Sequence, residues 1–162
     1  MKALVAFAIG VLIYILLIFF VKYSFGNPYK LFFYTVEVKN KSFEKVVEEL
    51  EDRLNKNGLK VIRILPLSKA LEERGVKDFT KYAIVLACDI PQKEELLAKV
   101  PSITNLIPCS IAVYEKGGVV RLTTLKELVF LAEEKNNLSS EDVKLIVDTY
   151  RTLRKTLHEV SK

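Results

Sequence analysis

An uninterrupted apolar run near the N-terminus constrains this chain more than any other feature. Residues 3–21, which begin with Ala3 and end with Val21, contain no charged side chain, and fourteen of these nineteen residues are Leu, Ile, Val or Phe. At 1.5 Å per residue, a helix of that length spans roughly 30 Å, about the hydrocarbon thickness of a bilayer. We therefore expect a single transmembrane helix, with the lipid bilayer as its partner and one domain behind it.

The processing and orientation of this segment depend on its flanks. A cleaved signal peptide would have a shorter apolar region ending near small residues, which Ser24 and Gly26 could imitate, but Lys22 follows the run directly. The sequence thus favours an uncleaved, single-pass anchor in the cell membrane over a cleaved signal. Lys2 on one side and Lys22 with Lys30 on the other nearly balance, so the positive-inside rule barely decides the orientation. We expect the domain outside the cytoplasm, because such an anchor commonly acts as its own export signal.

The break between anchor and domain is expected at Asn27 and Pro28. This gives an anchor with linker over residues 1–30 and an α+β domain over residues 31–162, which is long enough for one hydrophobic core. The net charge is +5, and Lys and Glu are interspersed without a basic block, so we expect no nucleic-acid partner. Abundant Lys and Glu with few thermolabile side chains resembles a thermophile's protein.

The remaining sequence predicts alternating strands and helices from its apolar spacing. Ser42 and Ser139 are expected N-caps, and Asn57 with Gly58 should end the first helix. The expected strands cover residues 34–38, 59–65, 82–90, 109–115 and 119–123, and the expected helices cover residues 43–56, 68–74, 91–100, 124–135 and 139–160. This order indicates an α+β fold, a mainly antiparallel sheet of about five strands with packed helices, behind the N-terminal transmembrane helix.

Several short stretches carry a family resemblance. They are Ser42-Phe43-Glu44, Gly58, Asp78-Phe79, Tyr82 through Ala87-Cys88, and Pro108-Cys109 running into Val113-Tyr114-Glu115. Together they resemble the family called domain of unknown function 302, over roughly residues 34–160. The resemblance implies a fold similar to the TATA-binding-protein-like class, a homodimer, and no assigned enzyme activity. The chain departs from the family where Asp89 and Ser110, instead of Asn, follow the cysteines, so a ligand held by those amides would be bound differently here.

The two cysteines are the sharpest candidates for chemistry. Cys88 closes one expected strand and Cys109 opens the next, so antiparallel pairing would bring both to one end of the sheet, near Asp89 and Pro108. They could be two small buried hydrophobes, a disulfide, or a thiol pair for redox, sulfur or metal chemistry. We take these four residues as the candidate thiol or ligand site. The sequence indicates no catalytic residue, metal site or cofactor.

Small side chains on the expected strands give a weaker signal. Ala83, Ala87, Ser110 and Ala112 would let another surface approach the sheet closely. That surface is either a helix of the same chain, or a bound ligand or second subunit.

These observations favour a dimeric, membrane-tethered binding or interaction module without enzyme activity, with a membrane protein as a further partner. A thiol protein that handles redox equivalents or sulfur through Cys88 and Cys109 is the first alternative. A small-molecule sensor is the second.

Overall fold

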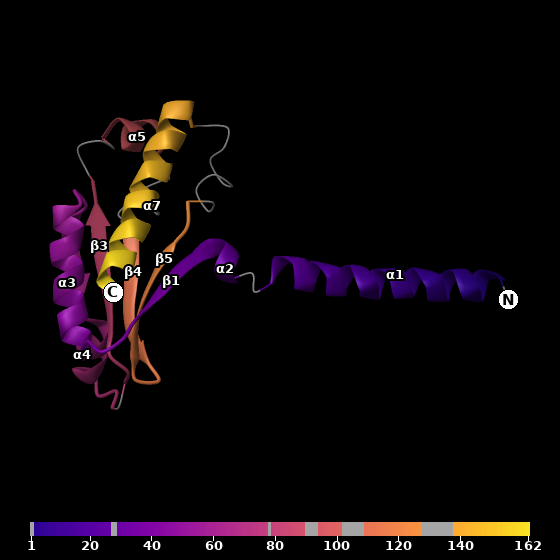
Figure 1. The fold of residues 1–162 in the computed structure, drawn as a ribbon, viewed down its shortest axis with the longest axis horizontal. Helices are drawn as coiled ribbons and strands as arrows, with labels where there is room; N and C mark the ends of the chain where they lie inside the picture. The colour runs from indigo at the N-terminus through magenta and orange to yellow at the C-terminus, as the bar shows by residue number, and fades with distance from the viewer. Residues whose placement is uncertain (1, 27–28, 78, 90–93, 102–108, 128–137) are drawn as a thin grey trace. The chain divides into compact units, whose positions relative to one another are not determined.

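The chain forms two compact units, Met1–Phe32 and Phe33–Lys162. The structure is a computed structural model that describes residues 2–26, 29–77, 79–89, 94–101, 109–127 and 138–162. The first unit contains helices α1 (Lys2–Phe25) and α2 (Tyr29–Phe32), and the second contains the sheet and its helices (Figure 1).

The expected membrane anchor is not supported by the first unit. A helix that crosses the hydrocarbon core needs about 20 consecutive apolar residues. Across the described ranges of the chain, no helix has both the length and the apolar character needed to cross a membrane. The predicted transmembrane helix at residues 3–21, its bilayer contact and the single-pass location in the cell membrane are therefore wrong.

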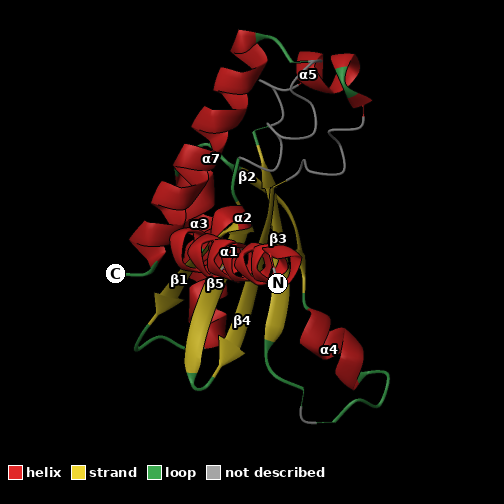
Figure 2. Cartoon of the chain, turned by 90° about the vertical axis from the view of Figure 1, so that its right-hand side faces the viewer, coloured by secondary structure: helices red, strands yellow, loops and turns green. Residues whose placement is uncertain are grey.

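The second unit is built on one five-stranded sheet, whose strands β1, β5, β4 and β3 lie side by side in Figure 2. Every neighbouring pair of strands is antiparallel, and the order across the sheet is β1-β5-β4-β3-β2. The strands are β1 (Phe33–Val38), β2 (Lys60–Leu65), β3 (Tyr82–Cys88), β4 (Cys109–Lys116) and β5 (Val119–Leu125). This confirms the predicted α+β fold with an antiparallel sheet of about five strands.

A two-residue turn joins β4 to β5. Gly117 and Gly118 both have positive φ, 62° and 74°, and Lys116 pairs with Val119 across the turn. Two consecutive positive φ values define a type I′ turn, whose twist matches that of the flanking strands. The predicted hairpin is thus present, and glycine is needed at both central positions because a Cβ would be strained there.

The two edge strands of the sheet differ in regularity. In β2 the register with β3 shifts between Val61 and Arg63, which leaves Ile62 as an extra residue, 49% exposed. Such a bulge bends an edge strand and interrupts its ladder. In contrast, β1 pairs with β5 in one continuous register from Phe33 to Val38.

The two long helices begin where the sequence predicts. The Ser42 hydroxyl accepts a hydrogen bond from the Lys45 amide at the start of α3 (Phe43–Lys56). At the start of α7 (Ser140–Val160), Ser139 and Asp142 form a reciprocal capping box. Each cap satisfies amides that an α-helix leaves unpaired at its first turn. Two shorter helices, α4 (Leu67–Glu72) and α5 (Glu94–Lys99), lie in the connections.

Helices α3 and α7 pack together on one face of the sheet and enclose the core (Figure 1). The sheet residues on this face include Val85, Ile111 and Leu122, all fully buried. The largest fully buried side chains are Leu50, Leu54, Leu96, Ile111, Leu122, Ile146, Leu153, Leu157 and Val38. Burying one such side chain is worth about 1.5–3 kcal/mol relative to leaving it exposed.

The sheet register divides the small residues between the two faces. Ala83 pairs with Val113 and Ala87 with Cys109, so both alanines lie on the face that α3 and α7 cover. Ala112 pairs with Ile84, on the opposite face. Ser110 shares that opposite face, because it pairs with Leu86. A packed helix of the same chain therefore accounts for the two alanines of β3 but not for Ser110 and Ala112.

Two predicted helices depart from the structure. Thr124, the expected N-cap of a helix over residues 124–135, lies in β5 and pairs with Ile111, because the strand continues to Leu125. Most of that expected helix, residues 128–135, lies outside the described residues. The helix expected from residue 91 is described from Glu94 as α5, and residues 91–93 also lie outside the described part.

Candidate functional site

The structure brings Cys88 and Cys109 to the same end of two neighbouring strands. Cys88 is the last residue of β3 and Cys109 is the first of β4. Because these strands are antiparallel and Ala87 pairs directly with Cys109, the two cysteines are near neighbours across the ladder. This is the placement that the order of elements predicts.

Neither cysteine forms a disulfide, and both are buried, each 1% exposed. Strand parity puts Cys109 on the face covered by α3 and α7, together with Ile111 and Val113. Successive residues of a strand point to opposite faces of the sheet, so Cys88 lies on the face opposite Ala87. Cys88 nevertheless belongs to the buried core. The structure therefore has no bridge between the two sulfur atoms, and it encloses both thiols.

Tyr150 of α7 completes a buried cluster with these thiols. Its side chain is 2% exposed, and it shares a side-chain hydrogen bond with Cys109. Burial raises the pKa of the Tyr150 phenol well above its ordinary value of 10.0, and the nearby Cys109, Cys88 and Glu127 raise it further. The phenol therefore stays protonated and acts as a neutral hydrogen-bonding partner. We call Cys88, Cys109 and Tyr150 the thiol cluster.

An ion pair lies close to the thiol cluster. Arg154, one turn after Tyr150 on α7, pairs with Glu127, and both side chains are about three-quarters buried. Burial by itself would raise the pKa of the Glu127 carboxyl, but hydrogen bonds from Arg154 and the main chain, with the positive charges of Arg154 and Lys126, outweigh it and lower the pKa. Glu127 is thus held as a carboxylate, and the arginine is engaged by it.

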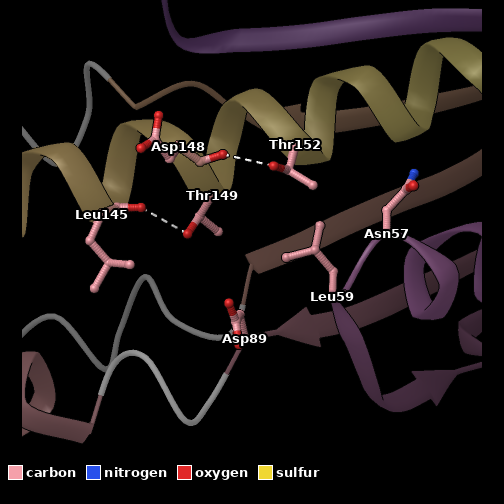
Figure 3. A pocket seen from close by; sticks show the side chains of 8 residues that line it. Asn57, Leu59, Asp89, Leu145, Asp148, Thr149 and Thr152 are labelled. Atoms are coloured by element: carbon pink, nitrogen blue, oxygen red, sulfur yellow. Dashed lines mark hydrogen bonds between the residues drawn. The ribbon is translucent and has the colours of Figure 1, made fainter.

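A polar pocket opens between α7, the end of α3 and the end of β3 (Figure 3). Its volume is about 400 Å³. It is lined by Asn57, Gly58, Leu59, Asp89, Leu145, Asp148, Thr149 and Thr152. Figure 3 shows Asp89 across the pocket from Thr149. Three segments that are far apart in the sequence thus meet around one space, which we call the polar pocket.

Hydrogen bonds fix most of the polar side chains in the pocket wall. The Thr149 hydroxyl donates to the Leu145 carbonyl at 2.9 Å, and the Thr152 hydroxyl donates to the Asp148 carbonyl at 3.0 Å. Both bonds are drawn in Figure 3. The amide nitrogen of Asn57 donates to the Thr156 hydroxyl at 2.8 Å and to a Glu159 carboxylate oxygen at 3.1 Å. Asn57 therefore ties the end of α3 to α7.

The polar pocket and the thiol cluster are built on adjacent residues. Cys88 directly precedes Asp89, and Tyr150 directly follows Thr149. In each pair one side chain lines the pocket while the other is buried in the core. A change in either site therefore acts on the same short pieces of β3 and α7.

The sequence-based candidate site maps onto these features only in part. Asp89 lines the polar pocket and is half-buried, whereas Pro108 lies outside the described residues. Sequence reasoning missed the pocket threonines and Tyr150. A detectable signal existed: hydroxyls at positions 149, 152 and 156 recur at helical spacing beside the apolar stripe, and a Tyr within such a stripe needs a partner for its hydroxyl.

Comparisons with known proteins identify the fold but no activity. The family model described as "Domain of unknown function DUF302" matches residues 34–160. A solved structure, the crystal structure of uncharacterized conserved protein DUF302 from Bacillus stearothermophilus, is similar with a TM-score of 0.69 and 21% identity, covering 81% of this chain and 98% of that chain. At that identity the likeness shows a shared fold alone. No curated protein matches this chain.

Replacing Tyr150 by Phe should change how the stability depends on pH. The folded-state pKa of this phenol is raised above the unfolded value of about 10, so above pH 10 the folded state binds more protons than the unfolded state. The free energy of unfolding therefore falls as the pH rises, by up to about 1.4 kcal/mol per pH unit for this one group. We expect urea denaturation between pH 9 and 11 to show a shallower fall for Tyr150→Phe than for the wild type. Tyr114→Phe, at a half-buried tyrosine on the opposite face of the sheet, is the control and should keep the wild-type slope; equal slopes in all three proteins would contradict this account.

Proposed function

The chain belongs to the family of the domain of unknown function DUF302. Within this family we propose that the chain is a small-molecule-binding module whose site is the polar pocket. The family membership confirms the resemblance inferred from the sequence. The observation that carries the proposal is the pocket itself, since a volume of about 400 Å³ falls within the range of about 300–1,000 Å³ typical of ligand sites. Its mixed wall, with the Asp89 carboxylate, two threonine hydroxyls and two leucines, resembles a ligand site more than a packing defect.

The groups in the pocket wall favour binding over catalysis. Activation of a hydroxyl as a nucleophile needs a base that accepts its proton. The hydroxyls of Thr149 and Thr152 instead donate to main-chain carbonyls of their own helix. In the part of the chain that the structure describes, no base is placed on either hydroxyl. The arrangement therefore supports recognition of a ligand by fixed polar groups.

Filling the pocket should abolish ligand binding without unfolding the protein. Thr152→Phe places an aromatic ring in the pocket wall, whereas Lys155→Phe adds the same ring at an exposed position of the same helix. A small polar compound at 100 times its Kd should stabilise the wild type by about 2.7 kcal/mol. We expect a thermal-shift screen to find compounds that stabilise the wild type and Lys155→Phe but not Thr152→Phe. The proposal fails if no compound stabilises the wild type, or if Thr152→Phe responds equally.

The thiol cluster supports a second candidate, a thiol protein that handles redox equivalents or sulfur. The observation in its favour is the convergence of Cys88, Cys109 and the Tyr150 hydroxyl from three separate elements. The exposed fraction of 1% for each thiol counts against it, because a thiol must be reached to react.

Alkylation of the native protein tests this second candidate. If the cysteines act on an external substrate, iodoacetamide should label Cys88 or Cys109 within minutes in buffer, as measured by mass spectrometry. Labelling that begins only when urea unfolds the protein would rule the candidate out. The urea-unfolded wild type provides the control for the intrinsic rate of labelling.

The sheet face opposite α3 and α7 supports a homodimer as the state in which the module acts. Five strands spaced about 4.8 Å apart, each about 20–27 Å long, offer a surface of roughly 600 Å² in projection. This approaches the roughly 800 Å² per partner of a standard stable interface. Ser110 and Ala112 on the middle strand β4 leave room for a second sheet, and Ile84 and Leu86 beside them supply apolar contact. A second copy of the chain is the partner that we propose for this face.

A charge at the centre of this face should separate the two subunits. We expect light scattering to give about twice the mass of 18.5 kDa for the wild type and about that single mass for Ala112→Glu. Ala98→Glu, on the exposed surface of α5, is the matched control and should remain dimeric. A wild type that is monomeric at all concentrations would overturn the homodimer.

A further inference from the structure

The chemistry of the polar pocket indicates the class of its ligand. This ligand class rests on the proposed function, in which the pocket binds a small molecule. The hydrogen-bonding groups and the charge of the wall decide which molecule fits.

The donors of the wall are already engaged. The hydroxyl protons of Thr149 and Thr152 go to carbonyls of α7, and the side-chain amide of Asn57 donates to Thr156 and Glu159. The main-chain amides of Gly58 and Leu59 donate to the carbonyls of Asn55 and Leu54. These groups can still accept hydrogen bonds from a ligand, through the oxygen lone pairs of the threonine hydroxyls and of the Asn57 side-chain carbonyl.

The charge of the wall is negative. Asp89 supplies the carboxylate that faces the space below α7, whereas the carboxylate of Asp148, which is also a lining residue, points to the other side of that helix (Figure 3). The described lining contains no Lys, Arg or His. The Asp89 carboxylate has no hydrogen bond or ion pair within the described ranges. Asp148 pairs with Arg151 at 2.7 Å, but both side chains are about half exposed or more, so water screens this pair strongly.

The end of α3 reinforces this potential. Helix α3 has 14 residues and ends at Lys56, and Asn57 and Gly58, which directly follow it, both line the pocket. The carboxyl end of a helix carries the equivalent of about half a negative charge. The pocket is therefore rich in hydrogen-bond acceptors and has a negative electrostatic potential. A ligand with hydrogen-bond donors and a positive charge would complement it.

An organic cation fits this wall better than a metal ion. In the described part of the chain, no group of three or more His, Cys, Asp or Glu side chains is placed to hold a metal. Leu59 and Leu145 add apolar surface to the same wall, which a bare ion cannot use but the carbon skeleton of an amine can. We propose that the polar pocket binds a small organic ammonium compound, with Asp89 as the residue that contacts its charge.

Three compounds of similar size but different charge test this inference on the full-length protein. Butylamine is a cation at neutral pH, butan-1-ol is neutral and butyrate is an anion. Saturation-transfer NMR with titration should show that the protein binds butylamine at least tenfold more tightly than the other two. Thr152→Phe should remove this binding, which would place it in the polar pocket.

Substitution of the carboxylates tests the assigned contact. Asp89→Asn should weaken butylamine binding at least tenfold, and Asp148→Asn should weaken it less, because the Asp148 carboxylate points to the other side of α7 (Figure 3). Asp52→Asn, which removes an exposed carboxylate paired with Lys56 on the outer side of α3, is the matched control and should leave binding unchanged. Circular dichroism of each variant confirms that the fold is kept.

The outcomes separate this inference from the proposed function. Pocket-dependent binding of butan-1-ol or butyrate as tight as that of butylamine overturns the cationic ligand and leaves the pocket as a binding site. Butylamine binding that survives Asp89→Asn unchanged, or that is displaced by millimolar Mg²⁺, also overturns it. If none of the three compounds binds in a manner that Thr152→Phe removes, and the wider thermal-shift screen is also negative, both proposals fail.

Discussion

Burial of two amphipathic helices against one face of one sheet is the constraint on which the second unit depends. The apolar stripes of α3 and α7 share one core with the sheet, which contributes Val85, Ile111 and Leu122. Polar contacts then fix how the helices lie. Lys41 bonds to Glu49 and to the carbonyl of Val160, which ties the start of α3 to the end of α7. Apolar burial provides most of the stabilisation, and such bonds select one arrangement.

The polar pocket follows from the unequal lengths of these two helices. Helix α3 has 14 residues and α7 has 21, a difference of about 10 Å. Asn57, at the end of α3, bonds to Thr156 and Glu159 in the later turns of α7. The earlier turns, from Leu145 to Thr152, extend past that contact and face the pocket. The pocket wall on these turns combines the apolar Leu145 with the hydroxyls of Thr149 and Thr152.

The sequence predicted the architecture of the second unit because its signals are local. Caps at Ser42 and Ser139 and the glycine turn at residues 117–118 each depend on a few neighbouring residues. Thr124 misled the prediction, because a capping-box spacing does not reveal that the residue is still paired with Ile111 in a sheet. The apolar run at residues 3–21 misled it differently, since composition was used to infer a bilayer contact that the described helices do not support.

The candidate site was harder to predict, because it depends on contacts between distant segments. Antiparallel order was enough to bring Cys88 and Cys109 to one end of the sheet. Nothing in the sequence places Thr149 opposite Asp89, or the Tyr150 hydroxyl beside Cys109, since both depend on how α7 lies across the sheet. The family comparison does not supply this information either, because it names a fold of unknown function.

The irregular register of β2 has a consequence for how the protein behaves at high concentration. An edge strand with unpaired amides and carbonyls can recruit a strand from another molecule, and repeated recruitment builds fibrils. The extra residue at Ile62, with the charged residues Lys60 and Arg63 in the same strand, makes β2 a poor template for that growth. Strand-by-strand extension of the sheet is therefore hindered at β2, so that growth in both directions, which a fibril requires, is disfavoured.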